Sequence, residues 1–193
     1  TQAAGPRPDQ ATINSKTAAD YTRANSDRMV STLTVNNVAS ASAYHGFMVA
    51  DLDSVTSTAA NPYSREGLIS DSGQFWGVFV RDNLGTYELC SYHWDGASNV
   101  AQTNITLSGP QLIEWRFDGS QLFIRLGSAG EVSGDTAGNI STLTGTLRTG
   151  SDGLQAVFID GRIAEPTVFN ANLGTTDRNN MRAYYAAQYG VTV

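Results

Sequence analysis

Residues 111–127, QLIEWRFDGSQLFIRLG, carry the pattern that decides the fold of this chain. The turn sequence Asp118-Gly119-Ser120 separates two segments in which bulky apolar residues alternate with polar ones. A period of two is typical of a β-strand with one buried face, and Asp-Gly between two such segments is the strongest local signal for a hairpin. We therefore predict two antiparallel strands joined by a tight turn.

Segments of the same kind recur along the chain. They occupy residues 44–52, 67–70, 74–82, 86–94, 99–107, 141–150 and 154–170. Residues 1–40 are polar and contain few aromatic side chains, so we expect only one or two short strands there. About ten short strands with Gly-rich turns between them are typical of an all-β sandwich or jelly roll. We predict a jelly-roll β-sandwich of two antiparallel sheets.

The C-terminal residues predict one helix. Thr175 or Thr176 can cap its start, Asp177 suits its first turn, and Gly190 can adopt the left-handed conformation at its end. We expect this helix to be a lid or an edge cover of the β domain, in a structural role. Three side chains at helical spacing are expected to pack inward and three to be ordinary solvated positions: Met181, Tyr184 and Tyr185 in the first group, and Arg178, Asn179 and Arg182 in the second.

Composition excludes several classes of function. The formal net charge is −6, so the basic surface of a duplex nucleic-acid binder is missing. Cys90 is the single cysteine, which excludes an intrachain disulfide, and with two histidines a structural zinc site is not expected. No segment approaches the roughly 20 apolar residues that cross a bilayer. We predict neither a nucleic-acid nor a membrane partner.

The longest patterned stretches resemble the laminin G-like group of the concanavalin A-like lectin/glucanase fold. Bacterial and bacteriophage members of that group end in a Gly-Arg/Lys-Ile-Ala-Glu strand, an Asn-x-x-Leu turn and a short helix that finishes in Tyr-Gly. The positions that match this ending are Gly161, Arg162, Ile163, Ala164, Glu165, Asn170, Leu173, Tyr185, Tyr189 and Gly190. The resemblance implies one domain over residues 1–193.

Two departures from the family pattern are visible. The family's first strand, with a Trp and an Asp, is absent before residues 2–14, and the chain starts at Thr1. We expect a fragment or a matured product of a longer polypeptide. In addition, Pro166 follows Glu165 where an apolar residue is usual, which favours an edge strand or a bulge.

Strand parity predicts a binding face. If the faces that carry Trp76, Trp94 and Trp115 form the core, the alternate side chains of the same strands gather on the opposite side of one sheet. These are Arg81, Tyr87, His93, Glu114, Arg116 and Arg125. Arginine and glutamate form charged hydrogen bonds to sugar hydroxyls, and tyrosine offers a stacking face. The family resemblance implies that glycans lie on such a face, whereas the simpler interpretation is a solvated sheet surface with balanced charges.

Catalysis and metal binding find weaker support. A lyase needs a base and a carboxylate-neutralising arginine, which His93, Tyr87 and Arg81 or Arg116 would have to supply, but lyase signatures are absent. A glucanase needs Glu-x-Asp-x-Glu on a strand. The nearest sequence, Glu131 to Asp135, is predicted to be a loop. Asp82, Asp95 and Asp118 lie in turns without a dense set of oxygen ligands, so we predict no calcium site and no other metal or cofactor.

The resemblance therefore implies a non-catalytic module on an extracellular or virion surface that binds glycans, as in a bacteriophage capsid decoration, tail or fibre. Its expected partners are a polysaccharide and other subunits of the particle or surface protein. Single sugar contacts are weak, so several copies are needed, and a homo-oligomer is one way to supply them. Two alternatives stay open. One is a purely structural decoration or tail assembly domain, and the other is a polysaccharide lyase or glycoside hydrolase.

Overall fold

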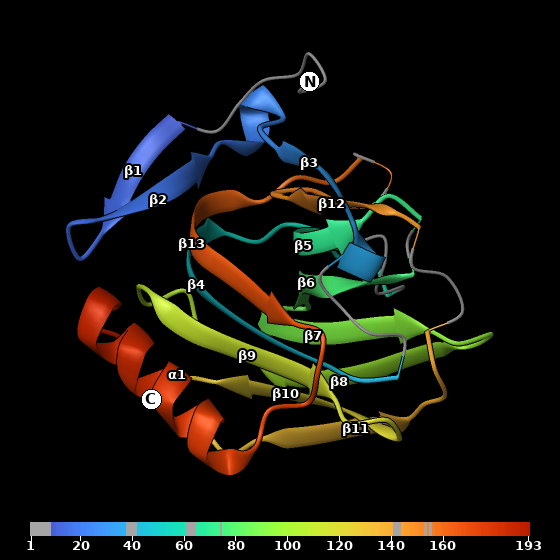
Figure 1. Cartoon of the computed structure of the whole chain (residues 1–193). Coiled ribbons are helices and arrows are strands. Elements are labelled where there is room, and N and C mark those ends of the chain that lie inside the picture. Colours follow the sequence, from blue (N-terminus) through green and yellow to red (C-terminus); the bar gives the residue numbers. More distant parts are fainter. Residues whose placement is uncertain are drawn as a thin grey trace.

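The chain folds into an all-β sandwich of two antiparallel sheets with one C-terminal α-helix, as predicted (Figure 1). The computed structural model describes residues 9–37, 42–60, 65–73, 75–140, 144–152, 154 and 156–193. Residues 1–8 of the predicted single domain lie outside these ranges. Within them, no helix is long and apolar enough to cross a membrane.

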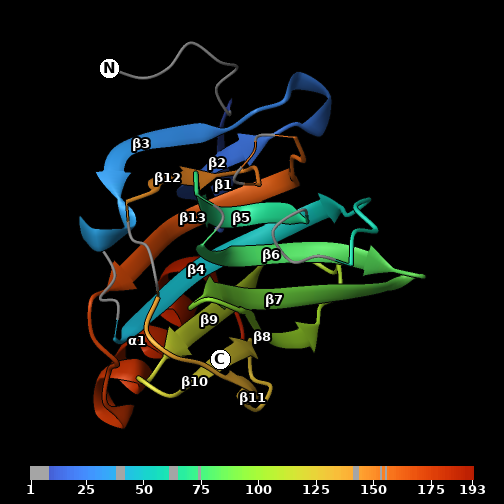
Figure 2. The ribbon, with the colours of Figure 1, turned by 90° about the vertical axis from the view of Figure 1, so that its right-hand side faces the viewer.

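The first sheet has seven strands, in the order β1-β2-β13-β4-β9-β10-β11. Its strands are β1 Asp9–Ile13, β2 Lys16–Tyr21, β13 Asp160–Phe169, β4 Tyr44–Ser54, β9 Gln111–Phe117, β10 Gln121–Leu126 and β11 Val132–Thr136. The second sheet has six strands, in the order β3-β12-β5-β6-β7-β8. Its strands are β3 Met29–Thr34, β12 Thr146–Thr149, β5 Glu66–Asp71, β6 Trp76–Asn83, β7 Thr86–Trp94 and β8 Ser98–Asn104. Figure 2 shows the six-stranded sheet from its outer side.

An aromatic core fills the space between the sheets. Trp76 of β6 and Trp115 of β9 are fully buried with ring centroids 6.3 Å apart, and Tyr44 of β4 meets Trp76 edge to face at 5.8 Å. Gly46 lies opposite Trp115, and a side chain there would overlap the indole. Burial of these large rings contributes to the hydrophobic stabilisation of the sandwich. The predicted inward faces of β6, β9 and β10 are confirmed.

The predicted inward face of β7 is wrong. Trp76 is registered with His93, and Val80 with Leu89, so the Leu89 and His93 side of β7 faces the core. Cys90 and Tyr92 lie on the outer side, where they are buried with Phe79. Because β7 is buried on both faces, its sequence lacks the polar-out alternation that marks an outer face. Trp94, on the outer side at the end of the strand, misled the assignment.

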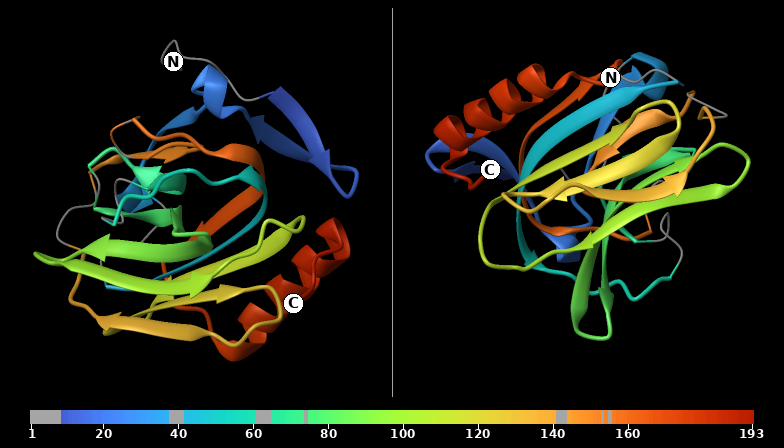
Figure 3. Two further views of the ribbon diagram at one scale, coloured as in Figure 1. Left: turned by 180° about the vertical axis from the view of Figure 1, so that it is seen from behind. Right: turned by 90° about the horizontal axis from the view of Figure 1, so that it is seen from below.

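The helix α1, Thr175–Tyr189, lies against the outer face of the seven-stranded sheet, as a lid and not as an edge cover (Figures 1 and 3). Tyr185 and Tyr189 are buried there against a cluster of apolar side chains from five strands: Ile13, Ala18, Phe47, Val49, Leu112 and Ala164. Met181 packs against this cluster as predicted. Tyr184, predicted to pack inward, is 41% exposed.

The ends of the helix agree with the sequence in part. Gly190 ends it with φ 67°, and Asp177 lies in its first turn, both as predicted. The N-cap is Gly174, which provides no side-chain hydrogen bond, so the prediction of Thr175 or Thr176 as the cap is wrong. Gly174 is extended and its carbonyl accepts the first helical bond, from the amide of Arg178, so both threonines are already helical.

A bulge in β13 receives the helix. The register of β13 against β4 shifts between Ala164 and Thr167, and Glu165 has φ 45°, which confirms the bulge expected at Pro166. The hydroxyl of Tyr185 donates to the Glu165 carbonyl at 2.7 Å. The hydroxyls of Tyr184 and Tyr189 donate to its two carboxylate oxygens at 2.8 and 2.9 Å. The helix is thus hydrogen bonded to the bulge.

Polar strands were underpredicted. Residues 9–34 contain three strands, where one or two were expected, and Glu131 to Asp135, predicted to be a loop, overlaps β11. These strands hold few large apolar side chains, and β11 is mostly exposed. Their pairing rests on backbone hydrogen bonds to a neighbouring strand, which leave no hydrophobic period in the sequence.

Candidate functional site

The six predicted site residues lie on three different surfaces, so the expectation that they share one exposed face is wrong. Tyr87 and His93 face the core. Arg81 lies on the outer face of the six-stranded sheet. The other three, Glu114, Arg116 and Arg125, lie on the outer face of the seven-stranded sheet beside α1. Two errors in the prediction explain this difference. The inward face of β7 is the opposite one, and β6 and β7 belong to a different sheet from β9 and β10.

Of the two residues that face the core, only His93 is fully covered by the fold. His93 is fully buried, and its Nδ1 lies 3.3 Å from the hydroxyl of Tyr44. Burial lowers the pKa of His93 to about 4, although Asp95 and a backbone hydrogen bond with Gly138 act in the opposite direction. The imidazole is therefore neutral at pH 7. Tyr87 is half-buried and packs against the core.

Arg81 is engaged in a surface ion pair. Its guanidinium lies 2.6 Å from Glu88, and the amide of Asn83 donates to the same carboxylate at 2.9 Å. Burial acts to raise the pKa of Glu88, but hydrogen bonds from Arg81 and Asn83 outweigh it and the net shift is downward. Arg81 therefore has a structural partner on its own face.

The remaining three residues belong to a larger group of charged side chains under and beside α1. We call this group the arginine array, and it comprises Glu114, Arg116, Arg125, Glu131, Arg178 and Arg182. Strands β9 and β10 supply three members, Glu131 directly precedes β11, and the helix supplies Arg178 and Arg182. The prediction that Arg178 and Arg182 are ordinary solvated positions is wrong, because both are bound to carboxylates.

Glu114 is the buried centre of the array. Arg182 donates to its carboxylate from Nε at 2.7 Å and from Nη2 at 2.9 Å, and His45 Nε2 lies 2.9 Å from its Oε1. Burial acts to raise the pKa of Glu114, yet the hydrogen bonds with His45 and Arg182 prevail and lower it. Burial lowers the pKa of His45. Glu114 is therefore held as a carboxylate and works as an acceptor.

Glu131 joins the sheet to the helix. Arg116 makes a bidentate contact with it, donating from Nε and Nη2 at 2.8 and 2.6 Å. Arg178 donates to the same carboxylate from Nη1 at 3.0 Å. The Arg116 guanidinium also lies 3.5 Å from the ring centroid of Phe123. Such stacked, paired guanidinium groups are rigidly held. This half of the array positions the helix start over the sheet.

Arg125 is the exception in the array. Its Nε donates to the carbonyl of Gly127 at 3.1 Å. It lines a hollow of about 390 Å³ with Asn179, Arg182, Ala183 and Val193. Burial, followed by repulsion from Arg182, lowers its pKa. The hollow offers guanidinium and amide donors to a solvent-accessible space.

The spacing of residues in the sequence indicates the helical part of the arginine array. Arg178, Arg182, Tyr185 and Tyr189 follow one another at steps of four, three and four residues, which is one stripe of a helix. We assigned the inward stripe to apolar residues alone, so the arginines were placed outside. His45 could not be found in this way, because its partner Glu114 is 69 positions away.

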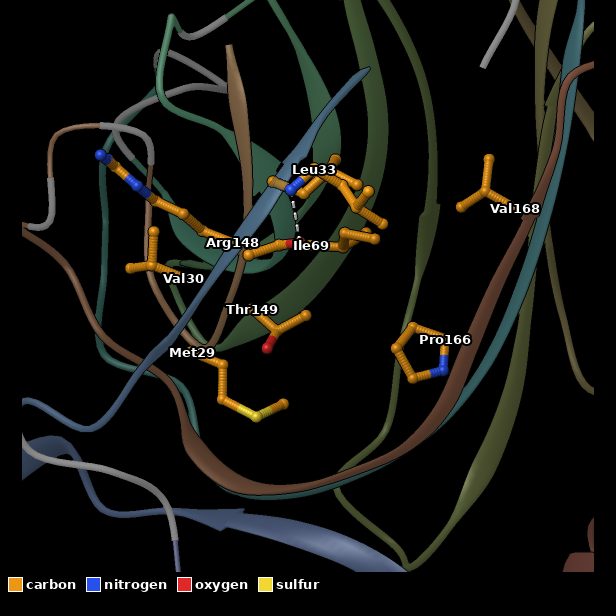
Figure 4. Close-up of a pocket in the computed structure, with 10 residues that line it drawn as sticks. Met29, Val30, Leu33, Ile69, Arg148, Thr149, Pro166 and Val168 are labelled. Carbon is orange, nitrogen blue, oxygen red and sulfur yellow. Dashed lines mark hydrogen bonds between the residues drawn. The ribbon is translucent and has the colours of Figure 1, made fainter. Parts of the chain in front are cut away.

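A second hollow opens at one side of the sandwich. An apolar pocket of about 360 Å³ lies between β3 and β12 of one sheet and β13 of the other, where Met29 and Leu33 face the same space as Pro166 and Val168 (Figure 4). Met29 and Leu33 are 39% and 48% exposed. An exposed apolar hollow of this kind suits an apolar partner surface better than a sugar.

Grouped metal ligands do not occur in the described part of the chain, where no three His, Cys, Asp or Glu side chains gather closely enough to hold an ion. The two carboxylates of the array are bound by arginine, and within the described ranges no contact brings a second carboxylate to either. The array can therefore donate and accept hydrogen bonds and attract an anion.

Comparisons with known proteins identify the fold. No protein-family model and no curated protein matches the chain. Among solved structures, domain 4 of AbnA, an extracellular GH43 arabinanase from Geobacillus stearothermophilus solved in complex with arabinotriose, superposes with a TM-score of 0.62. It is 11% identical, and the match covers 93% of this chain and 86% of that one.

Two other neighbours come from larger chains. The enzymatically active domain of tailspike protein 2 from bacteriophage CBA120 matches with TM-score 0.63 and 12% identity, over 96% of this chain and 31% of that chain. The binding domain of botulinum neurotoxin serotype G matches with TM-score 0.63 and 10% identity, over 97% of this chain and 47% of that chain. The chain thus spans a third to a half of these proteins. The likeness establishes the β-sandwich fold.

Proposed function

We propose that this chain is a non-catalytic carbohydrate-binding module of a virion or extracellular surface protein, of the laminin G-like kind that its C-terminal sequence resembles. The observation that carries the proposal is the near full-length likeness to an arabinanase domain that was solved with arabinotriose. The tailspike neighbour supports a setting in a bacteriophage particle.

The arginine array supports the location of the ligand. Sugars are recognised through hydroxyl groups, which need hydrogen-bond donors and acceptors held on a rigid surface. The array lies on a sheet and a helix packed together, and its hollow is lined by the polar side chains of Arg125, Asn179 and Arg182 together with the apolar Ala183 and Val193. We place the glycan there, so Arg125 keeps its predicted role, while Arg81, Tyr87 and His93 lose theirs because of their positions.

The absence of catalysis is part of the proposal. His93, which a lyase would use as its base, is buried with a pKa of about 4, and Glu114 is bound by Arg182. A general base must reach the proton that it removes. Incubation of the protein with uronate polymers, followed by ultraviolet absorbance of unsaturated ends, tests this point. Sustained turnover would overturn the non-catalytic assignment.

A glycan array that contains arabinans, neutral galactans and uronate polymers tests binding directly. We expect dissociation constants in the micromolar to millimolar range, about −4 to −8 kcal/mol, because one module makes few contacts. Particles that carry several copies should bind more tightly by avidity. Glu131→Ala, which loosens the start of α1, is measured beside the wild-type protein. It shows how damage to the arginine array affects glycan binding. Failure of the wild-type protein to bind any glycan at millimolar concentration would contradict the proposal.

A purely structural role is the second candidate. It is favoured by the apolar pocket with exposed Met29 and Leu33 between β3 and β13. Such a surface is suited to burial against another subunit. Leu33→Asp should abolish assembly without changing glycan binding if this role is correct. Unchanged assembly of that variant would speak against it.

A further inference from the structure

Arg125 differs from the other three arginines of the array in its partners. Arg182 uses Nε and Nη2 on Glu114 and Nη1 on Asn179. Arg116 and Arg178 are bound to Glu131. Arg125 donates only from Nε, to a backbone carbonyl, and within the described ranges no ion pair links it to a carboxylate. Its two terminal nitrogens are therefore available to a ligand.

The charge around Arg125 is not balanced. The side chains of the array comprise four guanidinium groups and two carboxylates, and Asp118 adds a third carboxylate 3.6 Å from Arg116. Among these side chains the guanidinium groups therefore outnumber the carboxylates by one. Burial and the nearby Arg182 lower the pKa of Arg125, while Glu114 and Glu131 act to raise it. An anion in the hollow would offset the repulsion from Arg182.

The shape of the hollow narrows the kind of anion. Its volume of about 390 Å³ falls in the ~300–1,000 Å³ range of small-molecule sites. The two terminal nitrogens of one guanidinium form a planar fork that matches the two oxygens of a carboxylate. Asn179 contributes an amide at the rim, and Ala183 leaves room beside it. A charged group with a polar body attached fits this arrangement.

We propose that the hollow at Arg125, Asn179 and Ala183 binds the carboxylate of a uronic acid residue, so the glycan that this module recognises is an acidic polysaccharide. This inference rests on the proposed function and specifies its ligand. The uronate carboxylate pairs with the terminal nitrogens of Arg125, and the sugar hydroxyls meet the amide of Asn179.

Calorimetric titration with matched sugars tests the proposal. The probes are oligomers of galacturonate, glucuronate, mannuronate and guluronate, each paired with its neutral counterpart. We expect at least one uronate oligomer to bind at least tenfold more tightly than its counterpart, and Arg125→Gln to remove that preference. Arg162→Gln makes the same charge change at a guanidinium that is paired with Asp51, so it should keep the preference. No preference in the wild-type protein would overturn the inference.

A second pair of variants tests the position of the carboxylate without removing an arginine. Ala183→Glu places a carboxylate in the hollow, and it should compete with the ligand and weaken uronate binding tenfold or more. Ala187→Glu adds the same charge at another exposed alanine of α1, outside the hollow, and should bind like the wild type. Glutamate is a good helix former, so both variants should fold. Equal binding by both would overturn the proposed place of the carboxylate.

The outcomes separate this inference from the proposed function. Equal binding of neutral and acidic oligomers, unchanged in Arg125→Gln, would leave a carbohydrate-binding module and overturn the uronate assignment. A trisaccharide that carries a sulfate group and no carboxylate is a further probe. Equally tight, Arg125-dependent binding of this probe would also overturn the uronate assignment, because the hollow would then select any anion. The absence of binding to every glycan would overturn both.

Discussion

At the scale of single residues, burial and partners decide what each ionisable group does. Glu114 and Glu131 are both acidic, both bind arginine, and both have a lowered pKa, yet Glu114 is buried and Glu131 is only partly covered. His93 lies on a strand like many surface histidines but is held neutral in the core. Their roles follow from their surroundings, and two predictions test this.

Removal of Glu114 should be far more destabilising than removal of Glu131. Glu114→Ala leaves Arg182 and His45 facing each other without their shared carboxylate, and loss of one partner of a buried ion pair costs about 3–5 kcal/mol. Glu131→Ala removes a more exposed carboxylate and should cost less. Urea unfolding of both variants measures the difference. Equal losses would contradict the central position of Glu114.

Stability should fall as the pH drops from about 6.5 to 4. The pKa of His93 in the folded state is about 4, below its ordinary value of 6.5, so the unfolded chain binds the proton first. The contribution is complete above pH 6.5 and lost at the folded pKa, and it amounts to about 3 kcal/mol. His93→Gln should reduce the slope in this window, with the remainder due to His45, whose pKa burial also lowers, as followed by urea unfolding at a series of pH values. A wild-type slope in that variant would refute the assignment.

At the scale of elements, the helix and the β13 bulge form one unit. Glu165 adopts a left-handed conformation that is unfavourable for a residue with a side chain. Three tyrosine hydroxyls of α1 bind it, from Tyr184, Tyr185 and Tyr189. The bulge thus holds the helix over the outer face, and the helix holds the bulge in its conformation.

Tyr185→Phe should therefore destabilise the protein more than Tyr184→Phe. The Tyr185 hydroxyl donates to the carbonyl of Glu165 and lies 2.9 Å from the hydroxyl of Thr167 in a buried setting. Its loss should cost about 1–2 kcal/mol. Tyr184 is exposed, so its substitution should leave the urea midpoint nearly unchanged. The two phenylalanine variants are matched in chemistry, and equal midpoints would argue against the bulge as the anchor.

At the scale of the whole molecule, the two sides of the sandwich differ. On one side β8 approaches β10 and β11, and the amide of Val100 donates to Asp135 of β11 at 2.9 Å (Figure 1). On the other side, the apolar pocket separates β3 from β13. The two sheets therefore approach each other on one side of the sandwich and stay apart on the other.

The closed side depends on Gly134. A Cβ atom on this residue would overlap the backbone of Val100 and Ala101, so Gly134→Ala should push β11 from β8 and cost about 1–3 kcal/mol. Gly130→Ala is the matched control, because a Cβ there meets nothing. Thermal unfolding compares the two. A fully stable Gly134→Ala protein would show that the approach of β8 and β11 is dispensable.

The sequence alone determined the features that depend on neighbours in the chain. Alternation over Gln111–Leu126, with the Asp118 turn, predicted a hairpin that the structure has, and the helix end at Gly190 follows from local backbone preference. Even Arg178 and Arg182 could have been assigned inward from their helical stripe. Periodicity, turns and capping depend on interactions between residues that are close in the chain, so a short stretch of sequence is enough to predict them.

Only the tertiary structure decided which side chains meet. The inward face of β7 follows from its register with β6, and the pairing of His45 with Glu114 joins strands 69 positions apart. The split of the six predicted residues over three locations depends on which strand lies beside which. So does the guanidinium of Arg125, which has no carboxylate partner within the described ranges. Register and sheet order arise from many weak long-range contacts summed over the fold, so no local pattern specifies them.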